Sequence, residues 1–198
     1  TAASGGAHTH ALAGIVLAVV MDLSGIVKKI FMPYVLASQM IPILGLAPVV
    51  FGLVKDIDLS RIVIAAYMTF FPVTISMMRG MSAIDPDSRA LLRLCAANKI
   101  QEYGKLIFPA SLPHLFTGLK LAAPMAVTAS VLVDTLSAKD GIGYVLVLTL
   151  YGGGTTGQFW PAVLLSSLMG VFSFVIVSLA EFLCIPWNRQ EGKGGDRR

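Results

Sequence analysis

The chain has 198 residues, of which 56% are hydrophobic and 13% are charged, whereas soluble domains carry about 25% charged residues. This composition excludes an ordinary water-soluble domain, and the abundance of apolar residues excludes a disordered chain. The formal net charge of +4 is small, and the basic residues do not alternate with aromatic ones as a nucleic-acid groove requires. The sequence therefore predicts one membrane domain and no nucleic-acid partner.

Five apolar stretches approach the roughly 20 residues that a helix needs to cross a bilayer. They lie at 11–27, 31–54, 62–78, 114–136 and 160–187. The second stretch contains Pro33, Pro42 and Pro48, which should kink or split it because each proline removes a backbone donor. The piece 142–151 is too short to span and predicts a re-entrant or interfacial helix. The expected fold class is all-α, a polytopic bundle with about five membrane helices.

The basic residues predict how these helices are oriented, because cytoplasmic loops carry an excess of Lys and Arg. They gather at Lys28 and Lys29, in the segment 79–105 and in the tail 188–198. If five spans alternate, these regions share one side, which we expect to be cytoplasmic. We expect residues 1–187 to form one membrane domain and 188–198 a basic cytoplasmic tail. Because the chain begins at Thr1 without a secretory signal pattern, we also expect it to be a fragment that lacks its N-terminus.

The segment 85–113 differs from the other loops because it is long, charged and helical in pattern. Asp85 can cap a helix, and Pro86 favours the first helical position. One helical face contains the apolar side chains of Leu92, Ala96, Ile100, Tyr103 and Ile107. Another face contains Arg89, Arg93, Gln101 and Lys105. Asn98 is expected in a left-handed turn between two short helices, and Pro109 and Pro113 are expected to end the segment. The pattern predicts an amphipathic hairpin at the cytoplasmic membrane surface, and a merely solvating surface helix explains it equally well.

This arrangement resembles the EAA loop of ABC importer permeases, in particular the nitrate, sulfonate and taurine type with its thiamine-precursor and riboflavin relatives. Aligned on Pro109, the family's Glu-Ala-Ala falls on residues 90–92, its arginine on Arg93 and its turn glycine on Ala96, and only the arginine matches. The flanks match better, at Asp85-Pro86, Pro109-Ala110-Ser111-Leu112-Pro113, Thr117-Gly118-Leu119-Lys120, Ile41-Pro42, Ala47-Pro48 and Gly141-Ile142-Gly143-Tyr144. The resemblance covers residues 30–187.

The resemblance implies a coupling loop over 85–109 that docks in a groove of a separate ABC ATPase subunit. The implied contacts are Leu92, Ile100 and Tyr103, with a polar rim of Arg93, Lys99 and Lys105, a turn at Ala96, and Pro109 at the end. The chain contains no Gly-x4-Gly-Lys-Ser/Thr phosphate loop, so ATP and Mg²⁺ are expected on the partner, with no cofactor on this chain. The other implied partners are an extracytoplasmic solute-binding protein, a second copy in a homodimer and lipid of the bacterial inner membrane.

The broken second span is our candidate for the substrate path, because freed backbone groups are tolerated in a membrane only where they are buried or line a cavity. The candidate lining residues are Gln39, Met40 and Pro42, opposite Phe70, Phe71 and Met77. Ordinary helix packing is the commoner role of such residues.

Acidic residues in apolar spans usually face a cavity or a partner. Asp134 is a candidate path residue, although a structural acid at the membrane interface is the more frequent case. Asp22 is expected either to reach the membrane surface or to pair with Lys28 or Lys29, and Glu181 to do the same near the C-terminal side. His8 and His10 have no further ligand nearby, so no metal site is predicted.

The function predicted is that of a permease subunit in an ATP-driven, binding-protein-dependent importer of a small polar or anionic solute. The alternatives are an integral-membrane enzyme and a membrane scaffold subunit without transport. Against the enzyme, the sequence has neither His-Glu-x-x-His nor Gly-x-Ser-x-Gly. The solute itself (sulfonate, nitrate, pyrimidine, flavin or another) stays open, because in this family the binding protein sets much of the choice.

Overall fold

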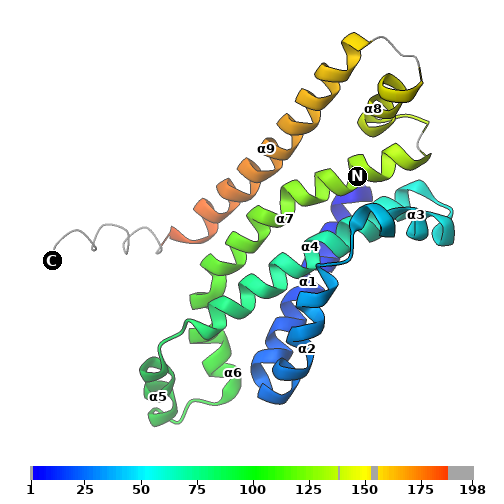
Figure 1. Cartoon of the computed structure of the whole chain (residues 1–198). Helices are drawn as coiled ribbons and strands as arrows, with labels where there is room; N and C mark the ends of the chain where they lie inside the picture. The colour runs from blue at the N-terminus through cyan, green and yellow to red at the C-terminus, as the bar shows by residue number, and fades with distance from the viewer. Residues whose placement is uncertain (1, 138, 153–155, 187–198) are drawn as a thin grey trace.

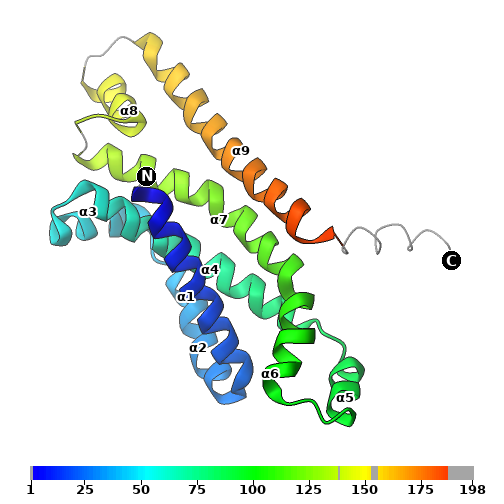
Figure 2. The ribbon, with the colours of Figure 1, turned by 180° about the vertical axis from the view of Figure 1, so that it is seen from behind.

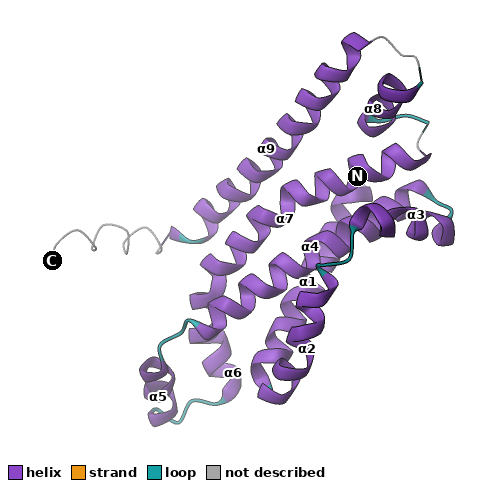
Figure 3. Cartoon of the chain, in the orientation of Figure 1, coloured by secondary structure: helices purple, strands orange, loops and turns teal. Residues whose placement is uncertain are grey.

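The computed structural model describes the backbone of residues 2–137, 139–152 and 156–186, and the side chains of 13–136, 139–152 and 157–186. The predicted basic tail 188–198 and the side chains of His8 and His10 lie outside these residues. Every regular element in the described part of the chain is helical (Figure 3). The helices are α1 (Ala2–Leu23), α2 (Gly25–Ser38), α3 (Ile43–Val54), α4 (Ile57–Ser82), α5 (Pro86–Leu94), α6 (Lys99–Glu102), a π-helical turn η1 (Tyr103–Ile107), α7 (Phe108–Ser137), α8 (Ile142–Tyr151), a 3₁₀ turn η2 (Thr156–Gln158) and α9 (Phe159–Cys184). The all-α prediction is confirmed.

Helices α4 and α7 lie side by side at the centre, with α1 against α4 and α9 against α7 (Figures 1 and 2). Helices α5 and α6 lie at one end of the bundle and α8 at the other. Small residues let the two central helices approach closely, as is common between membrane helices. A Cβ atom on Gly118 would lie 2.7 Å from Ser76 Cβ, and one on Gly80 would lie 2.8 Å from His114 Cβ.

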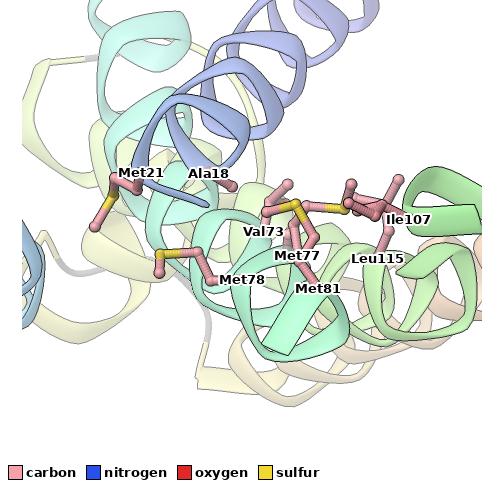
Figure 4. Close-up of a cluster of buried hydrophobic side chains, with 9 residues drawn as sticks. Ala18, Met21, Val73, Met77, Met78, Met81, Ile107 and Leu115 are labelled. Carbon is pink, nitrogen blue, oxygen red and sulfur yellow. The ribbon is translucent and has the colours of Figure 1, made fainter. Parts of the chain in front are cut away.

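A methionine-rich core joins α1, α4 and the start of α7 (Figure 4). It is formed by Ala18, Met21, Val73, Met77, Met78, Met81, Ile107, Leu115 and Ala122. Methionine has a flexible, unbranched side chain that fills irregular gaps between helices. A second, smaller cluster of Ala47, Ile64, Ala129 and Val133 packs α3 against α4 and α7. These contacts fix both ends of the central helix pair.

Among the described residues, three continuous helices are long and apolar enough to cross a membrane: α4, the helix Lys99–Leu136 and α9. The pair α2 and α3 makes a fourth candidate span, bent by 93° at its break. The first predicted span, 11–27, ends early, since α1 stops at Leu23 and Ser24 caps α2. Helix α1 has 22 residues, and its part with described side chains, Ala13–Leu23, is apolar.

The predicted split of the second span is confirmed, and it falls at residues 39–42. Pro42 caps α3 in an extended conformation, whereas Pro33 and Pro48 stay inside helices. The hydroxyl of Tyr67 on α4 donates a hydrogen bond to the carbonyl of Ser38 at the end of α2. A neighbouring helix therefore satisfies a backbone group that the break exposes.

Pro109 and Pro113 do not end the helical segment, contrary to the sequence prediction. Both lie within α7, and the helix runs without a break from Lys99 to Leu136. Prolines are tolerated in membrane helices where neighbouring elements support the chain. Here the residues around the prolines pack into the methionine-rich core through Ile107 and Leu115. The second arm of the predicted hairpin is thus the start of a membrane helix.

Candidate functional site: the α5–α6 loop and the broken span

The loop over residues 85–105, called here the α5–α6 loop, is shaped by its caps. Asp85 Oδ1 accepts a hydrogen bond from the Asp87 amide at 3.2 Å, and Pro86 opens α5. Asn98 caps α6 in an extended conformation and forms a reciprocal capping box with Gln101. The left-handed residue is Ala96, with φ 55°, so the prediction for Asn98 is wrong. The side chain of Asn98 instead caps the N-terminus of α6, and a residue at this position requires an extended backbone.

The loop exposes large apolar side chains at the end of the bundle. Leu94 is 84% exposed, Ile100 79% and Leu91 63%. Of these three, only Ile100 is a predicted docking residue. Among the remaining predicted docking residues, Arg93, Ala96, Lys99 and Lys105 are exposed, and Leu92, Tyr103 and Pro109 are half-buried. Ile107 lies in the methionine-rich core, so the single helical face predicted through this segment is wrong. The chain turns at 95–98, which resets the helical register.

Sequence reasoning missed Leu91 and Leu94 because it extended a single helical periodicity through the turn at 95–98. Taken alone, α5 places these two residues three positions apart, and hence on neighbouring positions of one helical face. A separate helical projection of 86–94 would have found them.

Asp22, near the end of α1, contacts two residues of the α5–α6 loop. Its Oδ2 accepts a hydrogen bond from the Tyr103 hydroxyl at 2.7 Å and lies 3.8 Å from Arg89 Nη2. The same Arg89 nitrogen donates to the carbonyl of Met81 on α4 at 2.8 Å. The alternative in which Asp22 pairs with Lys28 or Lys29 is therefore wrong. Lys28 Nζ instead donates to Ser82 Oγ at 3.1 Å, which places Lys28 at the same end as the loop.

The broken span borders a cavity of about 370 Å³ between α2, α3, α4 and α7. Gln39, Met40 and Pro42 line it together with Phe71. Other lining residues are Ile41, Ile43, Tyr67, Met68, Pro72 and Met125. Two predicted path residues lie elsewhere: Met77 is buried in the core, and Phe70 packs beside Gly14 of α1. On a continuous α4 they face α1 rather than the break.

Asp134 lies at the opposite end of the bundle from the loop, and not in the cavity. Its Oδ1 accepts from Arg61 Nε at 2.6 Å, and Arg61 Nη1 donates to Asp58 at 2.7 Å. Asp134 is only 7% exposed. Gly141, at φ 103°, and Gly143 pack directly on it, since a Cβ atom on Gly141 would lie 2.5 Å from Asp134 Oδ2. This geometry is that of a structural acid that joins α4, α7 and the α7–α8 turn.

Glu181 pairs across the bundle with Lys120, whose Nζ lies 2.7 Å from Glu181 Oε2. This contact joins α7 to α9 within their membrane-spanning parts. Sequence reasoning treated Lys120 only as part of a motif. A charged residue in an apolar span requires a partner, so the sequence indicated that Lys120 is paired but not with which residue.

Comparison with known proteins identifies the family. A family described as "Binding-protein-dependent transport system inner membrane component" matches residues 11–183. The chain belongs to this family. The family is one of inner-membrane transport subunits, which confirms the predicted membrane location and favours the permease prediction over a membrane enzyme or a scaffold subunit.

Three relatives illustrate the range within the family. The formylaminopyrimidine transport permease protein ThiX of Halalkalibacterium halodurans is 30% identical over 90% of this chain and 71% of its own length. The nitrate import permease protein NrtB of Leptolyngbya laminosa is 23% identical over 89% of this chain and 63% of its own. The riboflavin transport system permease protein RibX of Chloroflexus aurantiacus is 26% identical over 79% and 58%. The chain thus spans about two thirds of the length of these relatives.

Proposed function

We propose that this chain is the membrane permease of an ATP-driven importer, with ATP hydrolysed on a separate ABC ATPase subunit. The observation that carries the proposal is the exposed apolar surface of the α5–α6 loop. Leu91, Leu94 and Ile100 lie beyond the central membrane helices on a segment rich in charge. An exposed apolar patch with a polar rim is typical of a protein–protein interface.

The rim of this patch is basic. Arg93, Lys99 and Lys105 are exposed around the apolar residues, and the Ala96 turn lies between Leu94 and Ile100. The small side chain at the turn lets a partner approach the backbone closely. The proposed docking surface therefore consists of Leu91, Leu92, Arg93, Leu94, Ala96, Lys99, Ile100 and Lys105, while Tyr103 and Pro109 support it from inside. ATP and Mg²⁺ bind to the partner, and this chain carries no cofactor.

The cavity beside the broken span supports a path for the solute. Gln39 supplies a polar group, Pro42 holds the break open, and Met40 is 83% exposed. In our proposal, a second copy of the chain closes the exposed wall of this cavity, and the two copies form a two-fold homodimer. An extracytoplasmic binding protein delivers the solute. The relatives' names make a small polar or anionic compound the proposed class.

Uptake by the full-length protein with its cognate ATPase and binding protein tests the proposal. We expect ATP-dependent uptake of one of four labelled probes: nitrate, an aliphatic sulfonate, a formylaminopyrimidine or riboflavin. Replacing Gln39→Leu should lower this uptake severalfold, because the cavity loses a polar group, while the ATPase still co-purifies. Gln158→Leu is the matched control, since Gln158 caps α9 away from the cavity without a side-chain bond.

Two results would count against this assignment. Uptake of a transported probe that Gln39→Leu leaves unchanged would return the broken span to helix packing. The proposed solute class would be contradicted if the wild-type permease binds the ATPase but takes up none of the four probes, whether or not ATP is present.

A further inference from the structure

Three polar side chains meet where the α5–α6 loop joins the bundle: Asp22 of α1, Arg89 of α5 and Tyr103 of η1. We call them the Asp22 cluster. Tyr103 donates to Asp22 Oδ2 at 2.7 Å, and Arg89 Nη2 lies 3.8 Å from the same oxygen. Arg89 also donates to Met81 O at the end of α4. One carboxylate therefore contacts both arms of the loop, and one guanidinium joins α5 to α1 and α4.

The Asp22 cluster lies where it can transmit a displacement of the α5–α6 loop to α1. Asp22 is one residue from the end of α1, and Met21 beside it is fully buried in the methionine-rich core. Tyr103 begins the π-helical turn that links α6 to α7, and π-helical turns occur frequently at functional sites. Hydrogen bonds to a charged group are stronger than neutral ones, especially when they are partly buried. A displacement of the loop therefore acts on α1 through Asp22.

We propose that Asp22 is a positioning residue that makes α1 move with the α5–α6 loop when the ATPase changes conformation. This inference rests on the proposed docking of the ATPase at that loop. It adds a second route for the movement, since α7 is already continuous with the loop, while α1 is connected to it only through side chains and through the chain of α2–α4. Helix α1 packs against α4, and its Ala18 and Met21 share one buried cluster with Val73 and Met77 of α4, so a displacement of α1 reaches the centre of the bundle.

The first test measures how firmly the cluster holds the loop. Limited trypsin digestion of the purified full-length permease should cut after the exposed Arg93 and Lys99 about tenfold faster in Asp22→Asn and in Tyr103→Phe, since a hydrogen bond to a charged group contributes about 1.5 kcal/mol or more. Asp22→Glu should restore slow cleavage. The matched controls are Asp140→Asn and Tyr34→Phe, at two exposed positions outside the loop. Trypsin should cleave both variants at the wild-type rate.

The second test measures the movement itself in the complex with the cognate ATPase. A fluorophore on Leu23→Cys, in a background of Cys95→Ser and Cys184→Ser, should change its emission when ATP and Mg²⁺ are added. In Asp22→Asn the ATPase should stay bound while most of this change is lost. Asp22→Glu keeps the carboxylate and should retain the signal, which protects the test against a folding defect.

The outcomes separate this inference from the proposed function. If the ATPase does not bind the wild-type protein, the docking proposal fails, and with it the inference. If the ATPase binds and Asp22→Asn keeps the wild-type cleavage rate or the full ATP-dependent signal, the role of Asp22 is refuted while the docking proposal stands. A wild-type complex whose α1 signal does not respond to ATP also refutes it.

Discussion

Ala96→Glu is expected to abolish co-purification of the ATPase and transport, with membrane insertion unchanged. Ala96 lies exposed at the left-handed turn of the α5–α6 loop, between the apolar residues proposed to dock. A charge left unpaired at the buried centre of an interface costs about 2–5 kcal/mol, which lowers affinity by about 30-fold or more. Co-purification from membranes and a titration of the ATPase onto the purified permease measure the effect.

Two further variants at this surface serve as controls. Ala96→Gly should bind the ATPase at least as well as wild type, because glycine adopts φ 55° without the steric cost that alanine bears. Arg93→Ala removes an exposed rim charge and should cost only about 0–1 kcal/mol. Normal ATPase binding by Ala96→Glu would reduce the loop to a solvating surface segment.

Asp134→Leu is expected to destabilise the bundle by about 3 kcal/mol, the low end of the cost of breaking a buried ion pair. The substitution leaves the Arg61 guanidinium facing a leucine, and among the described residues the exposed Asp58 is its remaining ion-pair partner. It also adds bulk where Gly141 and Gly143 pack on Asp134. Thermal unfolding of the purified protein in detergent measures the loss, and we expect a lower unfolding temperature than that of the wild type.

The double variant Arg61→Leu, Asp134→Leu isolates the unpaired charge. It should be more stable than Asp134→Leu alone, because an apolar pair can replace a buried ion pair at little net cost. Asp140→Leu, at an exposed position in the neighbouring turn, should unfold close to wild type. A single Asp134→Leu variant with wild-type stability and reduced uptake would instead make Asp134 a path residue.

The helices and the broken span could be predicted from the sequence because they follow from local properties. Apolar stretches bounded by charge located four of the crossings, and Pro42 marked the break before α3. The short apolar helix α8 was predicted at 142–151 with the bounds that the structure has. The predicted path residues Gln39, Met40 and Pro42 line one cavity for the same reason, since they adjoin the break.

The long-range pairs could not be predicted, because nothing local specifies which charges meet. Arg61 and Asp134 are 73 residues apart, and Lys120 and Glu181 are 61 apart. The rotation of α4 about its axis, which buries Met77 and turns Phe70 toward α1, likewise depends on packing between helices. The left-handed residue of the α5–α6 loop shows this limit most clearly. The resemblance aligned Ala96 with a turn glycine, but residue preferences for left-handed backbone favoured Asn98.

The reaction of Cys95 with a membrane-impermeant maleimide tests most directly whether the α5–α6 loop is the cytoplasmic docking site. Cys95 ends α5 and is exposed, and a Cys184→Ser variant makes it the single thiol. We predict reaction in inside-out vesicles but not in right-side-out vesicles, and strong protection when the cognate ATPase is added. Reaction from the outside, or an unchanged rate with the ATPase bound, would contradict the account.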